Sequence, residues 1–505
     1  MNKFYQKDIE STTEYILPDY LGDVKKILTV SASAIPSGKF VSDGNVEFSG
    51  VVVYDMMYAD SDGKLTKLST TSDYDFSFTG SEADYIDSMA EPKVAGVSIR
   101  LTGPRKLIAK ATVTNNVLMS VENNLSVLGD AFENGNTPEV ETEQIMMENV
   151  MFASSSEREY AEEAEKILQV SPDGIEIIAT SGAVRITEST ASENGVLVKG
   201  EIIVTSIIRT DEQPPFAIRK SIPFEETINL EGVTPDMQVA ARGYLTSVTT
   251  GISEDSEGTS VTVNAIAEYS CYASENKEIS VISDAYLVER DSESKYENYS
   301  YTKLACMGNC ECEFSVSCAR ADIGCEEIRD VLQIGCDIRS YDEKRTPHGF
   351  EIFGDAIISG IACQIKEDDK PQYIPIKFVA PFSVNVNTNC QISENSTIEC
   401  GVCAVDVKDS LDSENLSVRC IISVSYHAYE TPFVKRVCEC SSVGENEYSA
   451  NLSRITVYYP DDGEKLFDIA KKFHTTREKI ASDNNLDAAV ISSGASVNLG
   501  KLIIR

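Results

Sequence analysis

An internal repeat constrains the fold of this chain more than any other feature of its sequence. A glycine followed by an apolar, β-branched run occurs at Gly50, Gly200 and Gly354, with spacings of 150 and 154 residues. Each run leads into a polar turn, and an aromatic residue follows the turn at a similar offset. The aromatic positions are Tyr74, Phe224 and Phe382. The pattern predicts three copies of one unit of about 150 residues, longer than the units of a tight solenoid.

Apolar and other residues alternate with a period of two through these repeats. In the second copy Val261 and Val263 flank Thr262, and the third copy shows the same spacing at Val418 and Cys420. Such alternation is typical of antiparallel strands with one buried face. Turn signals recur about every 8–12 residues, as they do in β-sandwiches. We therefore expect a mostly β chain with three tandem, sandwich-like antiparallel domains.

The start of each copy has a different pattern, which we interpret as a short helix. The three segments are 20–30, 160–170 and, more weakly, 325–334. The predicted domains are 1–150, 151–300, a cysteine-rich 301–445, and a separate small module at 455–505.

The C-terminal module has helical spacing instead of alternation. Apolar residues at Leu466, Ile469, Ala470 and Phe473 follow the i, i+3, i+4, i+7 pattern of a buried helix face. Thr476 is placed to cap a second helix. A short strand at 455–459 precedes the helices, and a second strand lies within 495–504. The predicted order is β-α-α-β, and the core of this small fold should include Leu486.

The charge balance narrows the classes of partner. The chain carries 81 acidic and 44 basic residues, a formal net charge of −37. Such a field repels nucleic acid phosphate and anionic lipid, so we expect no nucleic acid partner. It suits solubility first, and a basic partner or cations second. We find no run of about 18 apolar residues and expect no membrane span. The first twenty residues lack the pattern of a secretory signal, so we expect none.

The sequence offers little catalytic machinery. It contains three histidines, and we recognise no phosphate-binding loop, zinc-protease motif or nucleophile elbow. We therefore expect no enzyme, no catalytic residue and no cofactor, although an enzymatic reading would return if His348 or His427 lay beside several cysteines in a pocket. Asp60 and Asp62 loosely fit calcium spacing, but they fit a hairpin turn at least as well.

All fourteen cysteines lie between Cys271 and Cys440. Reduced thiols, disulfides or late cross-links, and a metal site are all compatible with them. Cys400 and Cys403 have metal-ligand spacing, but on a strand they would face opposite sides and chelate poorly. We expect reduced thiols and no metal.

The C-terminal module resembles LysM, a small non-catalytic module that usually binds N-acetylglucosamine glycans such as peptidoglycan. The family helix start is Gly-Asp-Thr-Leu, and here it reads Gly463-Glu464-Lys465-Leu466. The family motif Asn-x-Leu is kept at 484–486. The late Tyr-Pro-Gly-Gln turn is replaced by Ser492-Ser493-Gly494-Ala495. The loss of the Thr hydroxyl and of this turn weakens the case for a glycan groove.

The repeats themselves resemble SPOCS domains. The carriers are the stretch LPDYLGDVKKILTV at 17–30 and the strand Gly50–Tyr54. Several SPOCS copies before one C-terminal LysM module are similar to the SipL-type spore-coat morphogenetic proteins. That resemblance implies a protein of the mother-cell cytoplasm at the forespore surface, within the spore coat. It also implies a coat basement-layer ATPase as partner, bound through the LysM region.

Two functions follow from these patterns. The first is a non-enzymatic scaffold or adaptor in spore envelope morphogenesis that docks a coat protein through the C-terminal module. The alternative is attachment to peptidoglycan or another N-acetylglucosamine glycan of the cell wall or spore cortex. In either case we expect the contacts on two loops of the module. The predicted contact residues are Asp462, Gly463, Glu464, Lys465, Leu466, Asn484, Asn485 and Gly494.

Overall fold

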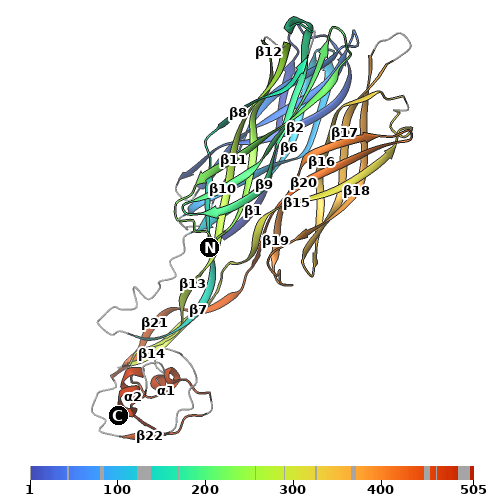
Figure 1. Ribbon diagram of the computed structural model, residues 1–505. Helices are drawn as coiled ribbons and strands as arrows, with labels where there is room; N and C mark the ends of the chain where they lie inside the picture. The colour runs from blue at the N-terminus through green and yellow to red at the C-terminus, as the bar shows by residue number, and fades with distance from the viewer. Residues whose placement is uncertain are drawn as a thin grey trace. The chain divides into compact units, whose positions relative to one another are not determined.

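The chain consists of two compact units that are built almost entirely of β-strands (Figure 1). The structure, a computed structural model, describes residues 2–42, 45–79, 85–121, 138–167, 170–255, 258–288, 290–324, 327–365, 371–447, 455–461, 463–486 and 501–504. Unit 1 comprises Met1–Glu122, Asn149–Glu275 and Leu304–Glu430. Unit 2 comprises Asn123–Glu148, Asn276–Lys303 and Thr431–Arg505. The expected mostly β, antiparallel fold class is confirmed.

Unit 1 contains three two-sheet sandwiches with one strand plan. In each, a meander of the second, third and fourth strands forms one sheet, and the first, sixth and fifth strands form the other. The first sandwich has β1 (Asn2–Ile16), β2 (Val24–Ser42), β3 (Asn45–Asp60), β4 (Leu65–Thr79), β5 (Tyr85–Gly103) and β6 (Lys106–Val121). The second has β8 (Arg158–Ile167), β9 (Ile175–Ser192), β10 (Gly195–Thr210), β11 (Phe216–Asn229), β12 (Gln238–Asp255) and β13 (Gly258–Tyr286), with β7 (Glu139–Ser154) added and a 3-10 turn at Pro172–Gly174. The third has β15 (Lys303–Ala319), β16 (Asp330–Thr346), β17 (Gly349–Ile365), β18 (Pro371–Asn387), β19 (Thr397–Leu411) and β20 (Asn415–Glu430).

The repeat glycines sit at equivalent places in the three central strands. Gly50 lies opposite Tyr74, and the second and third copies pair glycine with an aromatic residue in the same way. Those two pairs are Gly200 with Phe224 and Gly354 with Phe382. A Cβ on Gly50 would lie 2.4 Å from the Tyr74 ring, so the aromatic side chain covers a place where no side chain fits. The sequence repeat is therefore a repeat of strand register.

The expected helices at the start of each copy are wrong. Residues 24–30 belong to β2, 160–167 to β8 and 330–334 to β16. Each of these strands carries a register shift in that stretch, for example between Val24 and Lys26 and between Ile27 and Thr29. A bulge inserts one extra residue and breaks the period of two. The resulting apolar spacing of three to four residues mimics a helix face.

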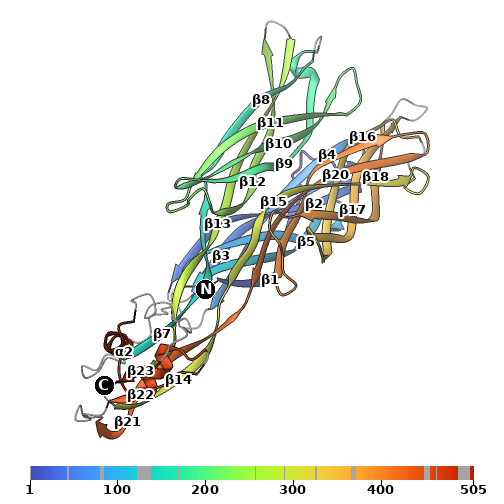
Figure 2. The same ribbon diagram turned by 60° about the horizontal axis from the view of Figure 1, so that its bottom comes forward.

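The three sandwiches pack against one another within unit 1 (Figure 2). The fourth strand of each contacts the second strand of the next: β4 contacts β9, β11 contacts β16, and β18 contacts β2. One buried cluster contains Met57, Ile207 and Ile361, each seven residues after the glycine of its copy. Equivalent residues from three copies thus share one core, as in a cyclic arrangement.

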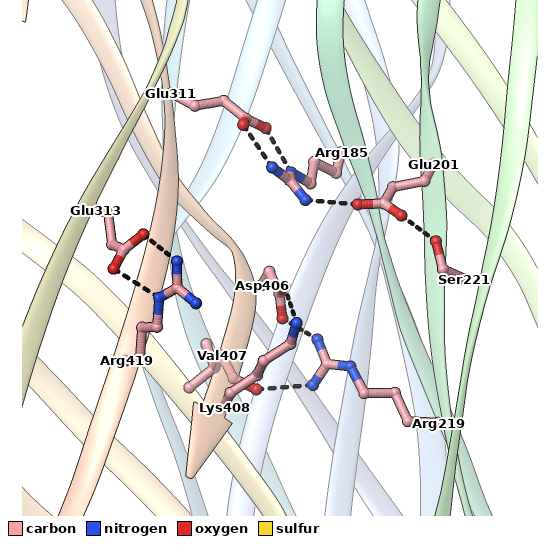
Figure 3. A network of polar contacts seen from close by, with 10 residues as sticks. All are labelled: Arg185, Glu201, Arg219, Ser221, Glu311, Glu313, Asp406, Val407, Lys408 and Arg419. Carbon is pink, nitrogen blue, oxygen red and sulfur yellow. Dashed lines mark hydrogen bonds and ion pairs between the residues drawn. The ribbon is translucent and has the colours of Figure 1, made fainter. Parts of the chain in front are cut away.

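Charged side chains tie the second sandwich to the third (Figure 3). Arg185 on β9 donates two hydrogen bonds of 2.6 Å to Glu311 on β15, and it also pairs with Glu201. Arg219 on β11 pairs with Asp406 on β19 and donates to the Val407 carbonyl at 2.8 Å. Bidentate arginine–carboxylate pairs of this kind fix orientation as well as contributing energy.

A further set of equivalent positions breaks the symmetry of the three copies. The fifth strand of each sandwich has a bulge, which follows Val94, Leu245 and Ala404 in the three copies. The residues three places before these are Glu91, Arg242 and Gly401. Arg242 Nη2 lies 2.8 Å from Glu91 Oε2. A Cβ on Gly401 would fall 1.6 Å from the same nitrogen. At these equivalent positions the acid of the first copy therefore pairs with the base of the second, and the glycine of the third leaves space for the guanidinium group.

Unit 2 is formed from the segments that connect the sandwiches, together with the C-terminal module. Its connector strands are the first part of β7, the last part of β13, β14 (Arg290–Ser300) and β21 (Phe433–Glu447). β14 pairs with β21, and β7 pairs with β13. Apolar side chains from these two strand pairs pack together, among them Ile145, Val281 and Val434. The module has β22 (Thr456–Tyr458), α1 (Leu466–Lys472), α2 (Arg477–Asn484) and β23 (Leu502–Ile504).

Candidate interaction site

The C-terminal module folds around a small apolar core. Leu466 and Ile469 of α1 and Ile480 of α2 are buried, with Phe473 and Leu486 packed at the margin. The side chain of Thr476 accepts a hydrogen bond from the Lys479 amide, as expected of an N-cap. β22 pairs with β23 in antiparallel register. In the described residues of the module the elements follow in the order β22, α1, α2 and β23.

Basic residues of the module hold it against acidic connector strands. This basic clamp consists of Lys465, Lys471 and Arg477. Lys465 Nζ lies 3.1 Å from Glu141 Oε1, and Lys471 Nζ lies 2.6 Å from Asp284 Oδ2. The clamp therefore links both helices to β7 and β13 within unit 2.

Arg477 makes the most contacts of the three. Its Nη2 donates to the Val140 carbonyl at 2.9 Å, and its Nη1 lies 3.4 Å from Glu141 Oε2. Its Nε lies 3.5 Å from Glu139 Oε2, and its guanidinium carbon lies 5.5 Å from the centroid of the Phe467 ring. A planar guanidinium can serve two carboxylates, a carbonyl and a ring at once.

A buried tyrosine completes the contact. Tyr286 of β13 donates from its hydroxyl to the Thr475 carbonyl at 2.7 Å, and its ring meets Phe467 edge-on. Burial raises the pKa of this phenol. Tyr286 belongs to the same apolar cluster as the core of the module, so the connector and the module share one core.

The carboxylates beneath the clamp differ in their protonation behaviour. Burial opposes the ionisation of Asp284, but hydrogen bonds from Lys471 and Tyr296 outweigh burial, and its pKa is lowered. Burial and then the nearby charge of Glu478 raise the pKa of Glu139, against the pull of Arg477. Asp284 therefore ionises more readily than an ordinary aspartate, whereas Glu139 ionises less readily than an ordinary glutamate.

The module also carries exposed apolar side chains on and beside β22. We call Ile455, Val457 and Tyr459 the outer row; their exposed fractions are 66%, 45% and 70%. Tyr458 between them turns inward onto Phe473. Ile503 pairs with Val457 and so lies on the same face of the two-stranded sheet.

The predicted contact residues have several local roles. Leu466 is a core residue, and Lys465 is paired with Glu141. Glu464 accepts hydrogen bonds from the Tyr458 hydroxyl and the Asp461 amide. The Asn484 side chain bonds the main chain of Ile503 through both of its polar atoms.

Gly463 and Asn485 are the predicted contact residues with open surroundings. Gly463 has a φ of +88° with open space around it, and Asn485 is an exposed left-handed cap with a φ of 52°. Asp462 and Gly494 lie outside the described residues. No ligand contact tests any of the eight, which remain predictions.

The sequence reasoning missed the connector residues and the outer row. Glu139, Glu141 and Asp284 are far from the module in sequence, and only the excess length of β13, 29 residues, signals that it serves more than one sandwich. The outer row was visible as alternating Ile455, Val457 and Tyr459, a strand whose apolar residues face away from the module core.

Other chemistry suggested by the sequence has a structural explanation. Asp60 Oδ1 accepts hydrogen bonds from the amides of Asp62 and Lys64, and Gly63 has a φ of +80°. These contacts form the hairpin turn that was the alternative to calcium. In the described residues, no group of three or more acidic, histidine or cysteine side chains is arranged to hold a metal ion. None of the helices in the same residues has the length and hydropathy needed to cross a bilayer.

Comparison with known families identifies part of unit 1. Residues 175–253 match the SipL, SPOCS domain family. The match covers β9, β10, β11 and most of β12, so this part of the second sandwich is similar to a SPOCS domain, a type of domain associated with sporulation. No curated protein matches the chain, and no solved structure does.

Proposed function

We propose that this protein is a non-enzymatic scaffold in spore envelope morphogenesis that docks a protein of the spore coat through its C-terminal module. The SPOCS match of the second sandwich supports the link with sporulation. The shared strand plan and glycine register of the first and third sandwiches support the proposal that they are further SPOCS copies.

The observation that carries the docking role is the exposure of the outer row, whose residues make none of the clamp contacts. The basic clamp and Tyr286 are engaged in contacts within unit 2. The outer row leaves three apolar side chains exposed to solvent. Large apolar side chains exposed on a small module favour protein recognition, because leaving them in water has a free energy cost.

The resemblance to LysM-containing SipL-type proteins suggests the partner. A coat basement-layer ATPase in the mother-cell cytoplasm, at the forespore surface, would bind the outer row. Because the clamp engages three of the module's basic residues, attraction of an acidic partner should be reduced, and apolar contact should contribute most of the affinity.

Affinity capture from sporulating cells tests this function. The full chain is compared with a chain that ends at residue 454, and captured proteins are identified by mass spectrometry. We expect one coat protein to be retained by the full chain and lost from the truncated one. Circular dichroism of the truncated chain verifies that its strands remain. If both chains retain every protein partner, the docking role is wrong.

Glycan attachment is a second candidate because Gly463 and Asn485 leave the two predicted loops open. Titration of the full chain with chitooligosaccharides tests it. Saturable binding that Asn485→Ala abolishes would favour glycan attachment over protein docking. Absence of binding up to millimolar oligosaccharide would remove this candidate.

A further inference from the structure

The fifth strands of the three sandwiches hold an unmatched basic residue. Two positions after Glu91, Arg242 and Gly401, on the same strand faces, the residues are Lys93, Tyr244 and Cys403. Glu91 has a base at its equivalent position, but Lys93 has no acid at either of its own. In the described residues the Lys93 ammonium makes no hydrogen bond and no ion pair, and it lies over the Tyr341 ring, 4.8 Å from Nζ to the centroid. Burial lowers the pKa of this half-buried lysine, because its charge is poorly solvated.

The same strands hold an unmatched acidic residue. Two positions before Glu91, Arg242 and Gly401, the residues are Met89, Ala240 and Glu399. Neither equivalent of Glu399 is a base, and its carboxylate has no ion pair in the part of the chain that the structure describes. Burial and then the charge of Glu343 on β16 raise the pKa of Glu399. These two carboxylates repel each other, so a cation placed between them would stabilise both.

Both unmatched groups line one cavity of about 580 Å³ in unit 1. This volume is within the range of small-molecule sites. Glu343 also lines the cavity, and Arg339, a further lining residue, is paired with Asp337 at 2.6 Å. Glu343 and Glu399 are exposed and Lys93 is half-buried, so solvent reaches the cavity from the side of the carboxylates.

Aromatic side chains from all three sandwiches form part of the cavity wall. They are Phe4 of β1, Phe152 of β7, Tyr272 of β13 and Tyr341 of β16. Two of these rings are held in place: Phe4 stacks on Tyr429 with centroids 4.5 Å apart, and the Tyr341 hydroxyl donates to the Cys400 carbonyl at 2.7 Å. Such a wall suits apolar side chains of a ligand.

The lining therefore specifies a ligand with two opposite charges and an apolar body. A carboxylate would partner Lys93, and an ammonium would partner Glu343 and Glu399. The positions of Lys93 and Glu399 differ by four residues, which corresponds to roughly 13 Å of extended strand, and both side chains shorten that span. The charges of a free amino acid are too close together for it, whereas two or three extended residues span roughly 7–10 Å.

We propose that this cavity binds a short peptide of two or three residues with free termini and apolar side chains. Its C-terminal carboxylate pairs with Lys93, and its N-terminal ammonium lies between Glu343 and Glu399. Its side chains pack on the aromatic wall. The site is formed within unit 1 and does not depend on docking through the C-terminal module.

Isothermal titration calorimetry of the full chain tests the proposal. The probes are the peptides leucyl-phenylalanine and leucyl-phenylalanyl-leucine, each also with an acetylated N-terminus or an amidated C-terminus. We expect saturable binding of at least one free peptide, and an affinity at least tenfold lower after either modification, because each removes one of the two charges. Absence of saturable binding up to millimolar peptide, or equal affinity of the free and modified forms, would overturn the proposal.

Two variants assign the charges to residues. Lys93→Met should weaken binding of the free peptide at least tenfold and make C-terminal amidation inconsequential. Glu399→Gln should reduce the effect of N-terminal acetylation. Lys377→Met removes an exposed lysine of unit 1 outside the cavity and should bind as the wild-type protein does. Circular dichroism verifies that each variant is folded. Unchanged discrimination against the amidated peptide in folded Lys93→Met would contradict the assigned role of this lysine.

Discussion

At the scale of single residues, the three repeat glycines are needed because there is no room for a side chain at their positions, and not because the backbone there must be flexible. A Cβ on Gly200 would lie 2.0 Å from the Arg185 carbonyl oxygen and 2.8 Å from the Phe224 ring. A backbone atom cannot move away as a side chain can, so the strand pair itself would have to shift. Glycine is retained there although it weakens an ordinary strand.

Gly200→Ala is therefore expected to destabilise the second sandwich by about 2–4 kcal/mol, through overpacking against the main chain. Gly103→Ala is the matched control, because a Cβ at that strand glycine meets open space. Chemical denaturation followed by circular dichroism measures both. Equal stability of the two variants would contradict the close packing.

The residue scale also shows how far sequence could predict the site. Core positions such as Leu466 and Ile469 followed from helical spacing, and the Thr476 cap from residue type. Lys465 was recognised as unusual, but its partner Glu141 was not, because a contact between residues so far apart in the chain has no local pattern.

At the scale of elements, alternation predicted the strands and bulges concealed some of them. β2 has three register shifts against β3, and two of them fall in the segment expected to be helical. A bulge depends on what the partner strand presents, so the segment's own period cannot predict it. The connector strands were missed for a related reason: β13 serves unit 1 and unit 2 in one uninterrupted element.

The clamp between the module and the connector strands should depend on pH. The lowered pKa of Asp284 means that its contribution to stability is present above the usual aspartate pKa and is lost as pH falls through the folded value. Asp284→Asn should cost about 1.5 kcal/mol at pH 7, since hydrogen bonds from Lys471 and Tyr296 to a charged acceptor are lost. The cost should be smaller at pH 3 than at pH 7, because the carboxylate begins to be protonated there.

Calorimetric melting of both proteins at pH 7 and pH 3 measures this difference. Asp291→Asn, a more exposed aspartate of unit 2, is a control for the removal of one negative charge. A cost of Asp284→Asn that is the same at both pH values would show that its ionised form does not stabilise the clamp.

At the scale of the whole molecule, three similar sandwiches reach a closed arrangement by using non-identical residues at equivalent positions. Glu91 and Arg242 pair where Gly401 leaves room. These different residues distinguish the three copies, so each sandwich fits only one position in the arrangement. The Arg185 and Arg219 contacts add direction to the interface between the second and third copies.

Arg242→Met should destabilise unit 1 by about 2–3 kcal/mol, because Glu91 is left with an uncompensated charge at the interface. Adding Glu91→Gln should recover part of this loss, since the double variant leaves no unpaired carboxylate. A double-mutant cycle by chemical denaturation measures the coupling. Strictly additive costs would show that the pair does not act as a unit.

We propose that the outer row is the point at which this protein contacts the spore coat. The most direct measurement is quantitative affinity capture with Val457→Glu, a charge placed on the outer row of the full chain. Val443→Glu on β21 is the matched control, because that valine is 50% exposed in the same unit and lies outside the module. Both changes are on the surface and should alter stability by less than about 0.5 kcal/mol. We predict that Val457→Glu reduces recovery of the coat partner at least tenfold while Val443→Glu retains it. Equal recovery by both variants would contradict docking through the outer row.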